Sequence, residues 1–203
     1  MKKREKDNTQ GKQYGFFTVS LAFFSISFLG WAYETLLMLL LHGKWYDRGF
    51  LFLPFCPIYG FPVCTLYLLF GTPTQGRFAN WLQKLCRTWR KVWQGVLRYF
   101  LYFLLAGVYA TLIELAVGLF TEAVGLSLWS YASEPFNLRG HVCLQVSLFW
   151  GFALTLFMRV AFPPLIKLLA KLRPKPSVVL GVVLGSALLV DFLFNAFSYF
   201  LTK

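Results

Sequence analysis

Five apolar runs constrain the fold of this chain more than any other feature of its sequence. They cover residues 14–41, 50–71, 99–120, 142–162 and 177–201. Each run has the length of about 20 residues that a helix needs to cross the hydrocarbon core of a bilayer. Of the residues, 58% are hydrophobic and only 14% are charged, whereas a soluble domain carries about 25% charged residues. The sequence predicts an all-α, polytopic membrane helix bundle with five transmembrane helices, which form one transmembrane domain over residues 14–203.

Lys and Arg residues are distributed unequally between the segments that flank these runs. Fifteen of them lie in residues 1–13, 72–98 and 163–176, whereas four lie in the other connections and at the C-terminus. Cytoplasmic flanks carry the excess of Lys and Arg, so we predict a basic cytoplasmic N-terminal segment over residues 1–13 and a C-terminus outside. The first run is longer than the apolar part of a signal peptide, so we expect it to be retained. The net charge of +12 thus reflects membrane topology, and we expect no nucleic-acid partner.

The connection over residues 72–98 has the pattern of a basic amphipathic helix on the cytoplasmic side. Apolar residues recur at helical spacing among Arg and Lys: Phe78, Leu82, Leu85, Trp89 and Val92. A helix of this kind suits the surface of an anionic inner leaflet. The alternative is docking onto a cytoplasmic partner, and the cations that would contact either surface are Arg87, Arg90 and Lys91.

Three acidic residues, Glu34, Glu114 and Asp191, fall inside the apolar runs. A charge at the bilayer centre costs about 2.5–3.5 kcal/mol on insertion scales, so each needs a partner or a role. Small and polar residues share the helical face of each acid, as faces that contact other helices do. At ~1.5 Å per residue the three carboxylates lie ~30, ~22 and ~21 Å from the inner starts of their runs, in the outer half.

We therefore predict that the acids meet in a polar cluster. Its expected members are Glu34, Arg48, Tyr59, Glu114, Asn137, Arg139, Asp191 and Asn195. The arginines would neutralise the acids through paired hydrogen bonds. A solute-binding or transport site, fixed ion pairs that hold the bundle together, and protonatable groups at the interface all remain open.

The stretch DRGFLFLPFCPIYGF, residues 47–61, places two prolines at the start of the second run. Pro57 has no N–H group and suits the first turn of a helix. If the helix begins near Pro57, residues 49–56 are non-helical backbone, which must be buried against protein or line a wet cavity. Such interruptions occur at the solute sites of transporters. A plain proline-capped helix is the alternative.

In the fifth run, the Gly181–Gly185 spacing predicts close helix packing.

The two halves of the chain share a weak pattern. An acid (Glu34 or Glu114) is followed by a Trp and a Tyr, an Arg–Gly pair and then a Cys (Cys56 or Cys143). This pattern is consistent with a parallel repeat of residues 14–71 and 99–162.

These motifs resemble those of bacterial membrane proteins labelled ABC-transporter type IV permeases. The resembling stretches are GWAYE at 30–34, RGFLFLPFCPIYGF at 48–61, LIELAVG at 112–118 and LWSYASEPFNLRGHVCLQVSLFWG at 128–151. Members usually have Gly where this chain has Leu53 and Pro62, which affects the expected local backbone. The resemblance implies a multi-span membrane protein of the permease kind.

The leading functional hypothesis is a transport component of the bacterial plasma membrane, such as the permease subunit of an ABC-type transporter. The chain has no GxxxxGK[ST] loop, so a separate cytoplasmic ATPase subunit would supply the energy. The alternative is a structural or regulatory membrane subunit that binds a partner protein. Besides the ATPase, the expected partner is the lipid bilayer, and a homo-oligomer stays open.

We expect neither enzymatic activity nor a cofactor, because no catalytic motif is present. Two weaker hypotheses concern the outer side. His42 and His141 lie close in sequence to Cys56 and Cys143, which raises an external metal site or a Cys56–Cys143 disulfide as minor alternatives.

Overall fold

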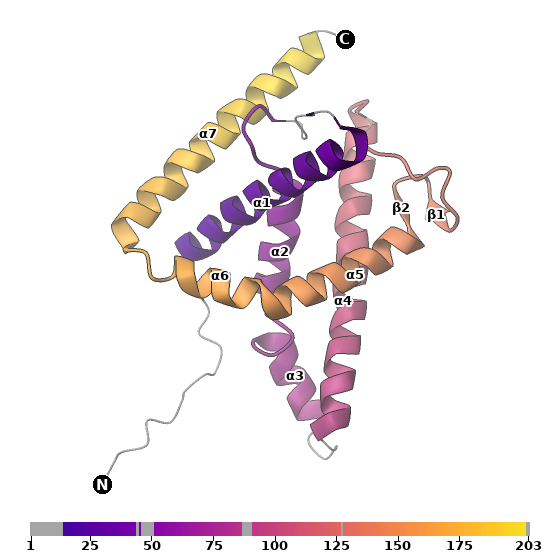
Figure 1. Ribbon diagram of the computed structural model, residues 1–203, viewed down its shortest axis with the longest axis vertical. Coiled ribbons are helices and arrows are strands. Elements are labelled where there is room, and N and C mark those ends of the chain that lie inside the picture. Colours follow the sequence, from indigo (N-terminus) through magenta and orange to yellow (C-terminus); the bar gives the residue numbers. More distant parts are fainter. Residues whose placement is uncertain (1–13, 44, 46–50, 87–90, 127, 202–203) are drawn as a thin grey trace. The chain divides into compact units, whose positions relative to one another are not determined.

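The structure is a computed structural model that describes residues 14–43, 45, 51–86, 91–126 and 128–201. It contains seven helices in this part of the chain. They are α1 (Phe16–His42), α2 (Pro57–Phe70), α3 (Arg77–Leu85), α4 (Lys91–Ala123), α5 (Leu144–Val160), α6 (Phe162–Leu169) and α7 (Pro174–Leu201). One short antiparallel pair, β1 (Asn137–Leu138) and β2 (Val142–Cys143), precedes α5 (Figure 1). The helical class predicted from the apolar runs is confirmed.

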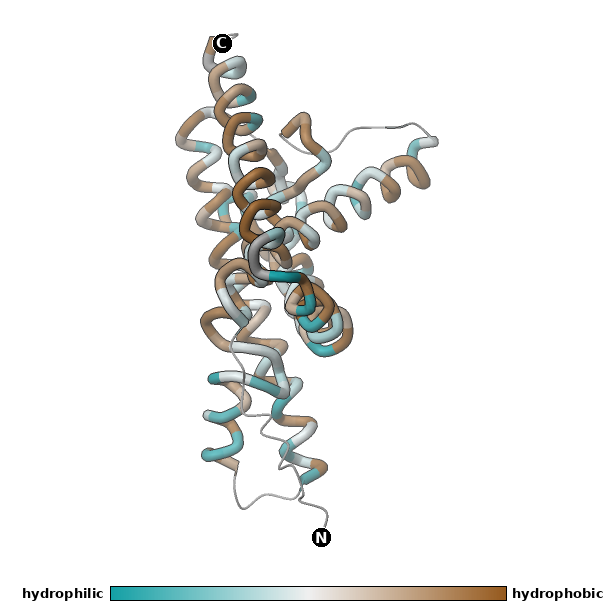
Figure 2. The backbone as a smooth tube through the Cα atoms, turned by 90° about the vertical axis from the view of Figure 1, so that its left-hand side faces the viewer, coloured by the Kyte–Doolittle hydropathy of each residue, from teal (hydrophilic) through white to brown (hydrophobic). Residues whose placement is uncertain are grey.

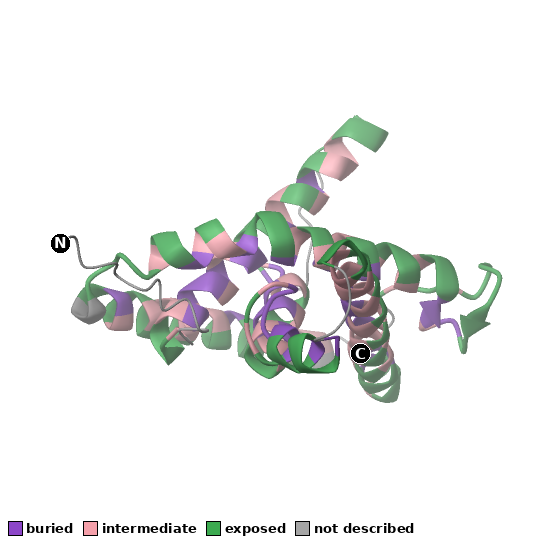
Figure 3. Ribbon diagram, turned by 90° about the horizontal axis from the view of Figure 1, so that it is seen from below, coloured by how far each residue is buried: buried purple, intermediate pink, exposed green. Residues whose placement is uncertain are grey.

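Three helices, α1, α4 and α7, are long and apolar enough to cross a membrane by themselves. Figure 2 shows the predominance of hydrophobic residues along the backbone. The apolar windows of α4 and α7 are only 17% and 11% buried, and exposed residues (green in Figure 3) recur along the helices. Apolar surface that the protein itself does not cover is what lipid-facing helices present.

The other two predicted spans differ from the expectation. Helix α2 has 14 residues, which at 1.5 Å per residue give about 21 Å, less than the hydrocarbon core of about 30 Å. The predicted span over residues 142–162 begins with β2 and is divided at Ala161 into α5 and α6, which qualify as a span only together. Pro163 and Pro164 occupy the first turn of α6 and lack the N–H groups that would continue α5.

The described chain forms two compact units. We call residues 66–162 the central unit, and residues 14–65 with 163–203 the terminal unit. In the central unit α4 and α5 pack closely, because Gly107 and Gly151 face each other. A Cβ atom added at Gly151 would lie 3.0 Å from the Phe103 carbonyl oxygen and 3.1 Å from the Gly107 Cα. The absence of both side chains therefore permits this helix contact.

Helix α3 lies against the first half of α4 in the central unit. Its Phe78 ring contacts the Tyr102 ring of α4 edge to face at 5.2 Å. The Tyr102 hydroxyl in turn donates a 2.7 Å hydrogen bond to the Gly71 carbonyl, which anchors the turn before α3. The amphipathic character predicted for the connection over residues 72–98 is present in α3. The helix is shorter than predicted, because it ends at Leu85. Phe78 and Leu82 are buried, and Val92 belongs to α4.

The terminal unit contains α1, α7 and the start of α2. Helices α1 and α2 approach closely at two glycines, since a Cβ atom at Gly30 would lie 2.5 Å from the Tyr59 ring and one at Gly60 would lie 2.5 Å from the Phe23 carbonyl oxygen. Helices α1 and α7 also contact each other. The predicted close packing at Gly181 and Gly185 is wrong, because Gly181 has no neighbouring atom within 4 Å and Gly185 has only the Phe24 ring, at 3.8 Å.

Candidate functional site

Asp191 lies on α7 and binds the backbone that precedes α2. The backbone N–H of Phe52 donates to Oδ1 at 3.2 Å, and that of Leu53 donates to Oδ2 at 2.8 Å. The Asn195 side-chain amide donates to Oδ1 at 2.8 Å, one helical turn further along. The side chain of Asp191 is buried. Three hydrogen bonds to one buried carboxylate make it an anchor for the segment that it binds.

Residues 51–56 are non-helical, and α2 begins at Pro57 as the sequence predicts. From Phe52 to Cys56, each backbone N–H group has an acceptor. Besides the two that Asp191 accepts, the N–H of Phe55 donates to the Leu53 carbonyl at 2.7 Å, and that of Cys56 donates to the Ser27 carbonyl at 2.9 Å. Pro54 has no N–H. This accounting lets irregular backbone lie within a membrane protein, because each donor has a protein acceptor.

Glu34 on α1 is bound by Tyr59 of α2. The tyrosine hydroxyl donates to Oε1 at 2.6 Å, a short distance typical of a hydrogen bond to a charged acceptor. The aromatic ring reaches this position by crossing α1 at Gly30, where any side chain would collide with it. The glycine one turn before the acid therefore creates the space for its partner.

Glu114 on α4 is bound by a tyrosine from outside the helices. The Tyr131 hydroxyl donates to Oε1 at 2.9 Å. The second oxygen, Oε2, is buried and has no hydrogen-bond partner among the described residues. A buried carboxylate oxygen without a donor costs free energy. Glu114 can therefore accept a proton, or a hydrogen bond or cation from a solute.

The segment between α4 and α5 is an ordered loop that delivers Tyr131. The Tyr131 N–H donates to the Gly140 carbonyl at 2.8 Å, and the Trp129 indole N–H donates to the His141 carbonyl at 2.9 Å. Asn137 accepts from the Gly140 N–H at 3.1 Å and donates to the Glu134 carbonyl at 2.7 Å. These bonds fix the loop independently of the long helices.

The environment of Tyr131 shifts its acidity. Partial burial raises the pKa of its phenol well above the usual value, and the Glu114 charge and the hydrogen bond to Glu114 raise it further. The phenol therefore stays protonated and acts as a hydrogen-bond donor at any physiological pH.

The structure places the predicted cluster as follows. It joins Glu34 to Tyr59, and Asp191 to Asn195. Asn137 stabilises the loop, and Arg139 is exposed at the tip of the β1–β2 turn. Within the described ranges no ion pair joins Arg139 to Glu114, whose bound partner is Tyr131. Arg48, Arg87 and Arg90 lie outside the described residues, and Lys91 is exposed at the first position of α4.

Sequence reasoning missed Tyr131 and also Glu122, which lies two turns after Glu114 on α4. Glu122 Oε2 contacts His141 Nε2 at 3.0 Å. A signal for the tyrosine was present, because a Trp and a nearby Tyr follow the acid in both halves of the chain. The signal for Glu122 was its spacing of eight residues from Glu114, which places both on one helical face.

The cysteines and histidines form no special centre in the part of the chain that is described. Cys56, Cys64, Cys86 and Cys143 are buried, and none of them is joined in a disulfide. The minor alternative of a Cys56–Cys143 disulfide is therefore not realised. No three His, Cys, Asp or Glu side chains among the described residues are grouped as metal ligands.

Comparison with known proteins identifies the family of the chain. No curated protein and no solved structure matches it. One family model, described as "Putative ABC-transporter type IV", matches residues 21–196, which is most of the chain. Together with the apolar helices and the polar groups on them, this match shows that the chain belongs to the ABC-transporter type IV family.

Proposed function

We propose that this protein is the membrane-embedded permease subunit of an ABC-type transporter of the bacterial plasma membrane. Glu114 is the centre of its polar site in this proposal. Family membership supports a transporter component, and the exposed apolar surfaces of α4 and α7 support a lipid environment. The proposed topology has a cytoplasmic N-terminus, an external C-terminus and five crossings, with α2 and its preceding segment as one of them.

The observation that carries the proposal is the unfilled oxygen of Glu114. Asp191 receives three hydrogen bonds and acts as an anchor. Glu114, by contrast, keeps Oε2 buried and unpartnered on a helix long enough to cross the membrane. Ionisable groups in such helices mark pathways of ions, protons or solutes. Tyr131 couples this carboxylate to the loop, so a movement of the loop would change the environment of the acid.

The terminal and central units also share internal geometry that supports a repeat of residues 14–71 and 99–162. Ser27 and Gly107 each lie seven residues before an acid. Gly60 and Ser147 each lie four residues after a buried cysteine. Ser27 contacts Gly60 in one unit, and Gly107 contacts Ser147 in the other. We infer that both units derive from one helix-pair ancestor.

A separate ATPase would bind the basic segment around α3 and the start of α4. Trp81 and Leu85 on α3 and Trp93 on α4 are exposed, and cations lie between them in the sequence. Aromatic residues and arginines are enriched in protein interfaces, so this surface suits a protein partner.

The decisive experiment is purification of the tagged full chain from native membranes in mild detergent. We expect co-purification of an ATPase with a GxxxxGK[ST] motif, and loss of that ATPase when Arg87, Arg90 and Lys91 are all changed to Glu. Reversal of Lys167, Lys171 and Arg173 is the matched control and should leave the complex intact. Stoichiometric recovery of a companion without an ATPase motif would contradict the transport proposal and favour the alternative, a structural or regulatory subunit.

A Glu114→Gln variant then tests the polar site. The variant should remain inserted and monodisperse but lose the solute-stimulated ATPase activity of the complex. An unchanged stimulation would exclude Glu114 as the centre of the site.

A further inference from the structure

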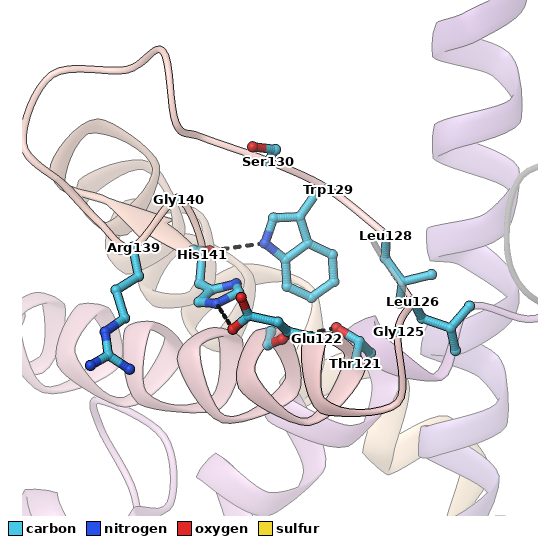
Figure 4. A pocket seen from close by; sticks show the side chains of 11 residues that line it. Thr121, Glu122, Gly125, Leu126, Leu128, Trp129, Ser130, Arg139, Gly140 and His141 are labelled. Carbon is cyan, nitrogen blue, oxygen red and sulfur yellow. Dashed lines mark hydrogen bonds and ion pairs between the residues drawn. The ribbon is translucent and has the colours of Figure 1, made fainter.

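A cavity of about 350 Å³ lies in the central unit at the C-terminal end of α4. Its walls come from the last turns of α4, the loop that follows and the turn between β1 and β2 (Figure 4). Gly118 forms part of the lining. Since Gly118 lies one helical turn after Glu114, the cavity adjoins the polar site along one face of α4.

One acidic and one basic residue, Glu122 and Arg139, line the cavity. Glu122 uses Oε2 to bind His141 at 3.0 Å, and its side chain is 67% exposed. Arg139 has no hydrogen-bond or ion-pair partner within the described part of the chain and keeps all its donors available. Figure 4 shows Arg139 on one side of His141 and Glu122 on the other. Glu122 and Arg139 carry opposite formal charges, one of each sign.

An aromatic ring lies on the Glu122 side of the cavity. The Trp129 indole N–H is occupied by the His141 carbonyl at 2.9 Å, which fixes the ring and leaves its face available. In Figure 4 this ring and the Glu122 carboxylate border the same space. An aromatic face beside a carboxylate attracts an ammonium or a quaternary ammonium group.

Arg139 occupies one of two central positions of a tight turn between β1 and β2. Arg139 and Gly140 both have positive φ, 54° and 73°, as the two central residues of a type I′ turn require. Gly or Asn suits such a position, and Arg adopts it only with strain.

We propose that this cavity binds a small zwitterion, with its ammonium group between Glu122 and Trp129 and its oxyanion at Arg139. A solute with both charges satisfies both groups, whereas an ion with a single charge leaves one of them without a counter-charge. The assignment rests on the proposed function only in that the bound solute is also the transported one.

The test is isothermal titration calorimetry on the full chain in nanodiscs with three probes of similar size. Glycine betaine carries both charges, 3,3-dimethylbutyrate only the anion and choline only the cation. We expect saturable binding of betaine that is at least about tenfold tighter than that of either analogue, the factor expected for one lost charged contact. Absence of saturable betaine binding, or equal binding of all three probes, would overturn the proposal.

Three variants assign the contacts. Arg139→Gly removes the guanidinium and also the backbone strain, so weaker betaine binding with unchanged or increased thermal stability identifies a binding role.

Glu122→Gln keeps a hydrogen-bond acceptor for His141 and should weaken binding of betaine and choline at least about tenfold, but not that of 3,3-dimethylbutyrate. Trp129→Phe should weaken binding of the two probes that carry a quaternary ammonium group, betaine and choline. Glu134→Gln and Arg159→Gln, both exposed, are matched controls without effect. Equal affinity in Arg139→Gly and the native chain would contradict the assignment.

Transport assays separate this inference from the proposed function. Binding with the expected charge profile but without ATP-driven uptake would support the pocket and contradict the transport function. ATP-driven uptake of another solute without betaine binding would support the transport function and contradict the zwitterion pocket.

Discussion

The hydroxyl of Tyr131 donates a 2.9 Å hydrogen bond to Oε1 of Glu114 and so connects an ordered loop to a membrane-spanning helix. Seventeen residues separate the two in sequence. The loop is held by its own hydrogen bonds, so the tyrosine arrives at the carboxylate already positioned. A donor that is ordered in advance loses little side-chain entropy when it binds.

Removal of this donor should destabilise the central unit. Tyr131→Phe removes the hydrogen bond that the Glu114 carboxylate accepts, so we expect a loss of about 1–3 kcal/mol in the free energy of unfolding. Thermal or denaturant unfolding in nanodiscs measures the loss. Tyr33→Phe, at a tyrosine that is 52% exposed on α1, is the control. Combination with Glu114→Ala, which removes the acceptor, in a double-mutant cycle should reveal coupling, and strictly additive effects would show that the hydrogen bond contributes nothing.

The contribution of Tyr131 should depend on pH only in the alkaline range. Its pKa is raised in the folded protein, so the hydrogen bond stabilises the fold fully below the unfolded value of about 10. This stability is lost as pH rises from there towards the folded pKa. The difference in unfolding temperature between the native chain and Tyr131→Phe should therefore stay constant from neutral pH to about 9 and shrink above about 10. A difference that shrinks already near neutrality would contradict this account.

Asp191 should be a structural anchor whose loss loosens the segment before α2. In Asp191→Asn one acceptor oxygen becomes an NH₂ group that faces a backbone N–H, and we expect destabilisation of about 1–3 kcal/mol. Cys56 is 5% exposed and ends this segment, so its maleimide labelling should accelerate in a background where it is the only cysteine.

The same experiment contains its own control. Cys143 is 2% exposed and belongs to the central unit, so its labelling in a second single-cysteine background should not respond to Asp191→Asn. Acceleration at both cysteines would indicate global unfolding in place of a local anchor.

Gly30 should be essential for the bond between Tyr59 and Glu34. In Gly30→Ala the new Cβ atom would lie 2.5 Å from the Tyr59 ring, so the ring must move and its hydroxyl loses Oε1. We expect a loss of about 1–3 kcal/mol, as for other strongly overpacked contacts. Gly181→Ala, where nothing lies within 4 Å, should instead raise helix stability by about 0.5–1 kcal/mol. Equal effects of the two substitutions would show that the Tyr59 contact has no special role.

The sequence by itself determined the class of the protein and the positions of the acidic residues within its apolar helices. Apolar length predicts membrane helices because the bilayer thickness is constant, and α1, α4 and α7 have that length. Pro57 predicts the start of α2 because proline lacks the N–H that a helix interior needs, and the helix begins there. The sequence also identified Glu34, Glu114 and Asp191 as groups that need partners.

Only the tertiary structure decided what those partners are. Arginines were expected on the grounds of charge, and Arg48 lies outside the described residues. Among the described residues Glu34 and Glu114 each receive a tyrosine hydroxyl, and Asp191 receives backbone N–H groups. Helical periodicity places a side chain on a face, yet it contains no information about the segment that will reach that face. Whether Tyr131 reaches Glu114 depends on the path of the loop, which follows from contacts between residues far apart in sequence, and these form only when the chain folds.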